Sequence, residues 1–398
     1  MKSIAIIGAS LAGVRAAQEL RAQGYDGRLE IVGEEAHRPY DRPPLSKSFL
    51  AGTAGHDALE LLEAEDDDEL GLRYRLGVRA ERLDPGNGVV ALSDGNELAV
   101  DGVVIATGGR ARTLPGAEGV AGVHVLRNLD DALRLRAELT DGAPRVVVVG
   151  AGFIGAEVAS TCRGLGLEVT VLESLATPLA TVLGPELGAA CAALHTDHGT
   201  RLRCGTTVRE LSTTSDGPRG HRVTGVRLDD GEHLPADVVV VGIGMTPATG
   251  WLAGSGLAVG DGVHTDGGLV TSLPTVVAIG DVARYRPAST GRRLRHEHWT
   301  NATEQAGVAV ANLLAGHTAR QHTASGYVWS DQYSATLQIA GHPAPDDEVV
   351  IVDGSIEDRA FVATYQRDGV TVGVFAMNNA RLFNRIRRQH RHSTAAVA

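Results

Sequence analysis

The stretch that decides the fold is APRVVVVGAGFIGAEVA, residues 143–159. Its run of valines predicts a strand buried on both faces, and the glycine turn GAGFIG at 150–155 opens a helix that reaches about residue 164. A further apolar run, LEVTVLE at 167–173, follows. This strand–turn–helix–strand order predicts a β-α-β unit in which the turn and the helix N-terminus bind the pyrophosphate of a dinucleotide.

The same order occurs 142 positions earlier in the chain, counted from Gly150 back to Gly8. The apolar run KSIAIIG (2–8) leads into the turn GASLAG (8–13), a helix of about twelve residues and the strand GRLEIVGE (27–34). Ser10 replaces the middle glycine, and its small hydroxyl side chain is expected to weaken the phosphate site without abolishing it. Two such units predict two dinucleotide-binding domains.

Each unit has an acidic residue at the end of its second strand. Glu34 follows Gly13 by 21 positions, and Glu173 follows Gly155 by 18 positions. Carboxylates at this place bind ribose hydroxyls and repel a 2′-phosphate. Between Glu173 and Arg201 there is no lysine or arginine to receive such a phosphate. The second unit is therefore expected to prefer NADH over NADPH.

Length and charge limit the classes of protein to be considered. A chain of 398 residues fits two or three domains, and its formal net charge of −11 gives no overall basic field for nucleic acid. The charge is uneven, because EAEDDDE (63–69) is acidic whereas RLFNRIRRQHRH (381–392) holds five arginines and no acid. Solvated surface is the ordinary interpretation of both runs, and the alternative for the second is a docking patch for an acidic partner.

Nothing in the sequence predicts membrane insertion, export or a metal site. It has no secretory segment at the N-terminus and no apolar stretch long enough to span a bilayer. Its three cysteines have neither C-x-x-C nor metal-ligand spacing, and the pair His296 and His298 is too small a ligand set. A reduced, cytoplasmic protein without a metal is expected. The oligomeric state stays open, with a monomer as the default.

Strand patterns extend both units and change near the C-terminus. Residues 89–109 and 223–244 each predict a hairpin or strands that run into a glycine-rich turn, and 271–283 predicts one more buried strand that ends before Asp281. The tail from about residue 320 consists of short runs separated by polar turns. These runs predict successive antiparallel strands in a small α+β domain.

One segment, HRPYDRPPLSKSFLAG (37–52), is more specific than either glycine turn. Together with ATGGRARTLPG (106–116), AIGDVA (278–283), HEHWTNATEQA (296–306) and WSDQY (329–333), it resembles the FAD-dependent NADH:ferredoxin reductases of the putidaredoxin-reductase type. Members of that family serve Rieske-type dioxygenases and haem monooxygenases. The resemblance covers nearly the whole chain in order and spacing.

The resemblance implies an α/β fold with glutathione-reductase-like architecture. A discontinuous FAD-binding domain (1–108 and 240–318) would enclose an NAD-binding domain (109–239), and a C-terminal α+β interface domain (319–398) would follow. The first turn would hold FAD and the second NADH. Hydride from NADH would reduce FAD, which would pass single electrons to a [2Fe–2S] ferredoxin.

Matching the family motifs to this sequence assigns cofactor-binding residues. Ala12 and Gly13 would lie at the FAD pyrophosphate, Glu34 at its ribose, Asp281 at the ribityl chain and Trp299 beside the isoalloxazine edge. Further FAD candidates are Gly8, Ser10, Leu11, Arg42, Ala80, Thr107, Gly108, Arg127, Gly244 and Gly280. Candidates for NADH are Gly150, Gly152, Phe153, Ile154, Gly155 and Glu173.

Lys47 and Glu157 are the candidate catalytic pair. In the resembling enzymes the lysine lies near flavin N5, stabilises the charge of reduced flavin and pairs with the glutamate. Without the family, Lys47 would be a loop lysine in solvent and Glu157 a glutamate on a helix face. Phe153 and Trp329 match aromatic positions near the nicotinamide and the flavin, and core packing is the alternative for each.

Three other functions compete with this interpretation. A flavin disulfide reductase or peroxidase needs a redox cysteine early in the FAD domain, and residues 35–60 contain none. A non-enzymatic flavoprotein similar to apoptosis-inducing factor would be expected to carry a targeting peptide and a basic face. An NADH-dependent flavin reductase with another acceptor (rubredoxin, a quinone or oxygen) stays an alternative.

Overall fold

The structure is a computed structural model that describes residues 1–217, 220–287 and 291–395, without the side chains of residues 64 and 390–395. The chain forms two compact units, and each contains three separate segments. Unit 1 consists of Met1–Asp41, Leu59–Arg110 and Thr246–Tyr327. Unit 2 consists of Arg42–Ala58, Ala111–Met245 and Val328–Ala398. Two of the five points at which the chain passes from one unit to the other lie within short strands, β8 (Gly109–Ala111) and β18 (Met245–Pro247).

Unit 1 is built on a five-stranded parallel sheet with the spatial order β21-β7-β1-β2-β3. These strands are β1 (Ser3–Ile7), β2 (Arg28–Gly33), β3 (Leu72–Leu76), β7 (Gly102–Ile105) and β21 (Val276–Ala278). The central strands are apolar along their length because both of their faces are covered.

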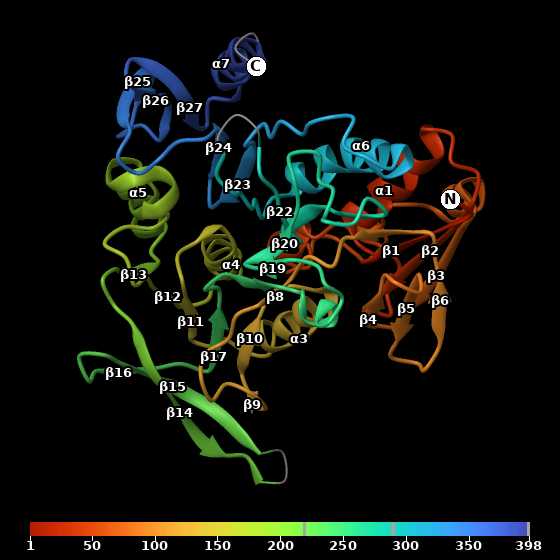
Figure 1. Ribbon diagram of the computed structural model, residues 1–398. Coiled ribbons are helices and arrows are strands. Elements are labelled where there is room, and N and C mark those ends of the chain that lie inside the picture. Colours follow the sequence, from red (N-terminus) through yellow and green to blue (C-terminus); the bar gives the residue numbers. More distant parts are fainter. Residues whose placement is uncertain (218–219, 288–290, 396–398) are drawn as a thin grey trace. The chain divides into compact units, whose positions relative to one another are not determined.

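Helices cover one face of this sheet and an antiparallel sheet covers the other. On one face α1 (Leu11–Ala22) and α6 (Trp299–Ala315) lie side by side, although they come from opposite ends of the sequence (Figure 1). Ile4 and Ile6 pack toward these helices, whereas Ala5 and Ile7 pack in the opposite cluster. That cluster includes β4 (Ala80–Asp84), β5 (Val89–Leu92) and β6 (Glu97–Ala99).

Unit 1 also contains smaller elements near its sheet. The acidic run forms the short helix α2 (Ala64–Leu70), in which Asp67 is buried and paired with Arg38 at 2.6 Å. The remaining strands form a small sheet: β19 (Val259–Gly260), β20 (Gly262–His264) and β22 (Ala283–Arg284). Asp67 is thus an exception to the interpretation of this run as solvated surface.

Unit 2 repeats the parallel sheet with the order β10-β17-β11-β12-β13. The strands are β10 (Val123–Val125), β11 (Val146–Val149), β12 (Val169–Leu172), β13 (Arg201–Arg203) and β17 (Val238–Val241). Its helices are α3 (Leu129–Leu139), α4 (Phe153–Gly164) and α5 (Ala180–Asp197). An antiparallel insertion holds β14 (Val208–Ser215), β15 (His221–Leu228) and β16 (His233–Pro235), and β9 (Val120–Ala121) pairs with β15. Both predicted β-α-β units are present.

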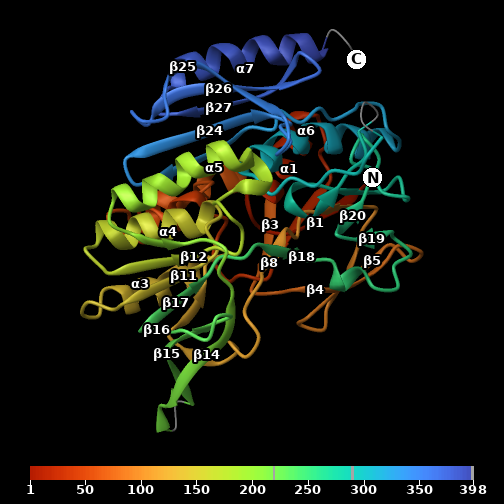
Figure 2. The same ribbon diagram turned by 90° about the vertical axis from the view of Figure 1, so that its left-hand side faces the viewer.

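The C-terminal part of unit 2 is a five-stranded antiparallel sheet, as predicted, with the order β23-β24-β27-β26-β25. Its face bearing Leu337 and Phe375 packs on α5, and α7 (Ala380–Ala395) covers the opposite face (Figure 2). The strands are β23 (Val328–Gln332), β24 (Ala335–Gly341), β25 (Glu348–Ser355), β26 (Ala360–Arg367) and β27 (Val370–Met377).

Candidate functional site

The first glycine of each turn is required by the backbone. Gly8 has φ +125° and Gly150 has φ +100°, values that residues with a side chain rarely adopt. A Cβ would lie 2.1 Å from the carbonyl oxygen of Ala106 at Gly8, and 2.4 Å from that of Gly242 at Gly150. Each turn therefore passes too close to the next strand of its sheet for any larger residue.

The third glycine of each turn is required by packing. A Cβ at Gly13 would lie 2.0 Å from the carbonyl oxygen of Gly8, and a Cβ at Gly155 would lie 2.0 Å from that of Gly150. Each helix thus begins in contact with the turn that precedes it. Each turn thus leads directly into the N-terminus of a helix, α1 or α4, whose first N–H groups have no partner within the helix.

The middle position has no such requirement. Ser10 has φ −131° and Gly152 has φ −71°, and ordinary residues adopt both values. Apart from chain neighbours, no heavy atom of the described residues lies within 4 Å of the position that a Cβ would take at Gly152. The middle glycine therefore leaves space for a ligand and is not needed for the fold, so Ser10 is compatible with an intact turn.

The helix N-termini and their acids complete two nucleotide cradles. Leu11 and Ala12 are buried at the start of α1, whereas Ile154 in the first turn of α4 is 45% exposed. Glu34 follows β2, and both of its carboxylate oxygens lie 3.1 Å from Nη2 of Arg110. Arg110 is a contact that the sequence had not indicated, although it lies in the ATGGRAR motif.

Glu173 differs from Glu34 in its surroundings. It is 8% exposed, and its carboxylate accepts hydrogen bonds from the backbone N–H groups of Ala151 at 2.8 Å and Leu175 at 2.9 Å. The carboxylate is therefore tied to the second glycine turn itself. A ribose held by Glu173 would lie beside the pyrophosphate cradle, as the motif requires.

Two other predicted residues of unit 1 belong to the AIGDVA motif, which lies beside the same turn. Gly280 has φ +72°, its N–H donates to Oε1 of Gln305 at 2.7 Å, and its Cβ position lies 3.2 Å from Cβ of Ala12. Asp281 follows directly, in a short 3-10 turn after β21. The AIGDVA motif and the first glycine turn are thus neighbours, although 268 positions separate Ala12 from Gly280.

Four more predicted residues of unit 1 have defined places. Thr107 donates its hydroxyl to the carbonyl of Ala248 at 2.9 Å, and Gly108 has φ +59°. Trp299 is the first residue of α6, and its indole N–H donates to Asp41 at 2.7 Å, a contact that was not predicted. Ala80 begins β4 and packs partly in the core of the unit.

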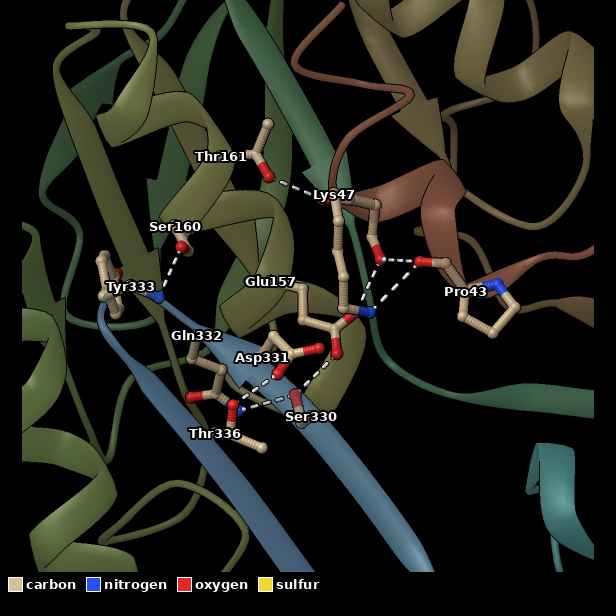
Figure 3. Close-up of polar contacts among 11 residues, drawn as sticks. Pro43, Lys47, Glu157, Ser160, Thr161, Ser330, Asp331, Gln332, Tyr333 and Thr336 are labelled. Atoms are coloured by element: carbon tan, nitrogen blue, oxygen red, sulfur yellow. Dashed lines mark hydrogen bonds and ion pairs between the residues drawn. The ribbon is translucent and has the colours of Figure 1, made fainter. Parts of the chain in front are cut away.

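In unit 2 the predicted catalytic pair is in contact. Nζ of Lys47 lies 2.6 Å from Oε2 of Glu157, with the glutamate side chain 4% exposed and the lysine side chain 23% exposed (Figure 3). Lys47 follows the 3-10 turn Pro43–Ser46 and also donates to the carbonyl of Pro43 at 3.1 Å. Glu157 lies on α4, one turn after the glycine turn. Neither residue occupies the solvent-facing place that the alternative interpretation gave it.

Two serines that the sequence had not singled out complete this pair. The hydroxyl of Ser46 donates to Oε2 of Glu157 at 2.6 Å, and the hydroxyl of Ser330 on β23 donates to Oε1 at 2.6 Å. Both serines are buried. A buried carboxylate is tolerated when it is paired with a cation and its remaining lone pairs accept hydrogen bonds, and Glu157 satisfies both conditions.

The remaining predicted residues of unit 2 are more varied. Arg42 donates to the backbone carbonyl of Arg127. Phe153 packs partly against the apolar cluster of α5 and the C-terminal sheet. This packing is what the alternative interpretation, a core phenylalanine, predicts for it. Gly244 follows β17 with φ +92° and open space at its Cβ position. Trp329 lies next to Ser330 on β23 and therefore on the opposite face of the strand, the face that α7 covers.

The histidine pair of unit 1 lines a small cavity. His296 and His298 precede α6 and, with Asn301 and Glu304, surround a volume of about 10 Å³, room for about one water molecule. Burial lowers the pKa of His298.

No helix of the ranges described is both long and apolar enough to cross a membrane.

Comparisons with known proteins agree with this geometry. Residues 2–306 match the family described as pyridine nucleotide-disulphide oxidoreductase, and residues 327–397 match a reductase C-terminal domain. Putidaredoxin reductase from Pseudomonas putida is 36% identical over 386 residues, which are 96% of this chain and 90% of that protein. The ferredoxin–NAD(+) reductase component of the biphenyl dioxygenase system of Paraburkholderia xenovorans is 35% identical over 96% of this chain and 91% of its own length.

Solved structures give the same result. The crystal structure of the covalent putidaredoxin reductase–putidaredoxin complex matches with a TM-score of 0.91 and 34% identity, over 97% of this chain and 92% of that one. The FAD and NAD(H) chemistry expected from the two turns is that of the family. This chain belongs to the pyridine nucleotide-disulphide oxidoreductase family, among the flavoprotein reductases related to putidaredoxin reductase.

Proposed function

We propose that this protein is a ferredoxin reductase that uses NADH and FAD to reduce a [2Fe–2S] ferredoxin, which in turn serves a monooxygenase or dioxygenase. The observation that carries the proposal is the ion pair of Lys47 with Glu157, a buried glutamate on the helix that follows the second glycine turn. In the resembling enzymes a lysine paired in this way lies near flavin N5, so the ion pair supports a site of flavin reduction. Two relatives that match nearly the whole chain are named as ferredoxin reductase components of dioxygenase systems.

The residues present fit both dinucleotides. In unit 1 the N-terminus of α1, with Ala12 and Gly13, would hold the FAD pyrophosphate, and Glu34 would hold its ribose. In unit 2 the open space at Gly152 would admit the NADH pyrophosphate, and Glu173 would hold the ribose. Bound FAD supplies the chemistry that accepts a hydride and gives up single electrons.

Further cofactor contacts follow from the same assignment. Asp281 would hold the ribityl chain, Trp299 would flank the flavin, and Ala80 and Arg127 would contact FAD. We assign these cofactor roles to an FAD-binding domain of residues 1–108 and 240–318 and an NAD-binding domain of residues 109–239. The domain of residues 319–398 would face the partner, and the protein would act in the cytoplasm.

Lys47 would stabilise negative charge on the flavin. An ammonium held in place before the reaction stabilises charge more effectively than mobile water does, because no reorganisation is needed. Glu157 orients the ammonium and offsets its partial burial. No side chain of the chain has to transfer a proton for this role.

The C-terminal sheet offers the surface for the acceptor. Trp329 lies on the sheet face covered by α7, a helix in which Arg381, Arg385 and Arg388 are exposed. The chain as a whole has a net charge of −11, so this helix is a local basic surface on an acidic protein. An acidic ferredoxin would be attracted to this surface and repelled elsewhere.

A reduction assay tests the proposal. The purified protein should be yellow, and NADH should bleach its flavin absorption much faster than NADPH does. Adding a [2Fe–2S] ferredoxin should then accelerate cytochrome c reduction by NADH many-fold. Fast NADH oxidation by oxygen with no effect of ferredoxin would contradict the assignment of the acceptor.

A further inference from the structure

We propose that Ser46 and Ser330 are positioning residues for Lys47. They hold the Glu157 carboxylate in place by donating one hydrogen bond to each of its oxygens. The lysine ammonium is then free to turn from the glutamate toward negative charge on the cofactor. The proposal rests on the proposed function, because it assumes that Lys47 serves a bound flavin. It assigns a role in reduction to a residue of the C-terminal sheet, β23.

The hydrogen bonds divide between the two carboxylate oxygens. Oε2 of Glu157 receives both Nζ of Lys47 and the hydroxyl of Ser46, each at 2.6 Å. Oε1 receives the hydroxyl of Ser330 at 2.6 Å, and that hydroxyl in turn accepts a hydrogen bond from Nε2 of Gln332 at 3.2 Å. If the ammonium moves away, each oxygen keeps one donor. A buried carboxylate oxygen left with no donor is strongly destabilising, and these two hydroxyls prevent that state.

One face of α4 holds both segments that supply the serines. Glu157, Ser160 and Thr161 lie at positions i, i+3 and i+4, and therefore on the same side of the helix. Thr161 donates to the backbone carbonyl of Ser46 at 2.7 Å, and Ser160 accepts a hydrogen bond from the backbone N–H of Tyr333 at 2.6 Å (Figure 3). The backbone of Ser46 and the end of the strand that carries Ser330 are thus held on α4 by contacts that do not involve Glu157.

The composition of the chain supports a lysine side chain that moves between two anionic partners. The sequence has 37 lysine and arginine residues, and Lys2 and Lys47 are the only lysines. An arginine would bind Glu157 with two parallel hydrogen bonds and hold it tightly. A lysine presents a compact charge on a flexible stem, which is suited to moving between two anionic partners. Lysine at position 47, in a chain that otherwise uses arginine, fits a cation that must be released.

The test compares Ser330→Ala and Ser46→Ala with Ser330→Thr, which restores a hydroxyl, and with Thr336→Val. Thr336 is on the same hairpin, and its hydroxyl contacts Asp331 and not Glu157. In the flavin-loaded protein, each alanine variant should slow flavin reduction by NADH about tenfold at saturating NADH with KM little changed. Its flavin should also become about tenfold harder to reduce, a fall of about 30 mV for a two-electron couple. Ser330→Thr should recover most of both losses, and Thr336→Val should match the wild type.

A second measurement does not need the cofactor. With lysine labelled by ¹³C at Cε alone, the spectrum has only two lysine side-chain signals, which a Lys2→Arg variant assigns. The Lys47 signal of the flavin-free protein should shift in Ser330→Ala and Ser46→Ala and should stay in place in Thr336→Val. An unchanged Lys47 signal, or a folded alanine variant with wild-type potential and reduction rate, would overturn the positioning role. If NADH fails to reduce the wild-type flavin while the signal shifts as expected, the proposed function fails and the serine–glutamate–lysine link stands.

Discussion

Ser330 on β23 and Glu157 on α4 are 173 positions apart in the sequence, and their side-chain oxygens are 2.6 Å apart in the structure. This hydrogen bond joins the antiparallel C-terminal sheet to the helix that begins at the second glycine turn. The carboxylate that receives it also receives Lys47. The candidate catalytic pair is therefore completed by a segment that a two-domain nucleotide-binding protein would not need.

Lys47→Met should slow flavin reduction by NADH by at least tenfold, because it removes the cation expected to stabilise charge on the flavin. KM for NADH should change little, since Lys47 is assigned to the flavin and not to the binding of NADH. Stopped-flow absorbance of the flavin measures the rate constant. Lys47→Arg keeps the charge but would hold Glu157 with two hydrogen bonds, so it should restore only part of the rate. Equal rates for wild type and Lys47→Met would remove Lys47 from the mechanism.

Gly13→Ala should destabilise the protein by about 2 kcal/mol, because the new methyl group would lie 2.0 Å from the carbonyl oxygen of Gly8 and the helix would have to shift. Ser10→Gly should change the free energy of unfolding by less than about 0.5 kcal/mol, since the backbone at this position is ordinary. Chemical denaturation of the flavin-free protein measures both changes. Similar losses for the two variants would contradict the distinction between turn positions.

Glu173→Gln should weaken NADH binding about tenfold and NADPH binding less, which narrows the preference for NADH. The amide would lose the charge that repels a 2′-phosphate, and its NH₂ group would meet the backbone N–H groups of Ala151 and Leu175. Kd values for both nucleotides from flavin-quenching titrations give the ratio. Glu168→Gln, an exposed glutamate near the same strand, is the matched control and should leave the ratio unchanged.

Arg385→Glu with Arg388→Glu should raise KM for an acidic ferredoxin several-fold, because it reverses charge on the exposed side of α7. The effect should shrink as salt is added, since exposed charges are screened. Steady-state cytochrome c reduction at two ionic strengths measures it. Arg79→Glu, an exposed arginine of unit 1, should leave KM nearly unchanged. If both sets of variants behave alike, α7 is ordinary solvated surface.

Acid should destabilise the fold through two buried histidines. Burial lowers the pKa of His195 and of His322 to about 4, below the unfolded value of 6.5. The unfolded chain therefore binds more protons below pH 6.5, and stability is lost as the pH falls from 6.5 toward 4. Between pH 7 and pH 5 each histidine should cost about 2 kcal/mol of unfolding free energy. Urea titrations at the two pH values should show a smaller loss in His195→Gln, and an equal loss would assign the acid sensitivity to other groups.

Much of the fold follows from local features of the sequence. The apolar runs at 2–8 and 143–150 become central parallel strands, because continuous hydrophobicity suits a strand covered on both faces. The short polar-separated runs after residue 320 become the antiparallel sheet. Within the candidate site, the pairing of Lys47 with Glu157 was expected from the family motifs and is present.

Other parts of the site could not be predicted from the sequence. Ser46 lies beside Lys47 in PPLSK, and Ser330 lies beside Trp329, yet serine is too common in loops and strands for either to stand out. The contacts of Arg110 with Glu34 and of Asp41 with Trp299 could not be predicted from the sequence either. Each joins segments from 76 to 258 positions apart, and no periodicity or local motif encodes such a meeting.

The sequence by itself determined the two β-α-β units, because local geometry requires the first and third glycines of each turn. The first glycine has a positive φ, and the third lies where the helix starts in contact with its own turn. The structure shows that position 10 accepts serine, since the middle residue of the turn has an ordinary backbone. Only the tertiary structure decided what surrounds Glu157. Hydrogen bonds act over about 3 Å, so Ser46, Lys47 and Ser330 meet on one carboxylate only after a loop, a helix and the C-terminal sheet have packed together.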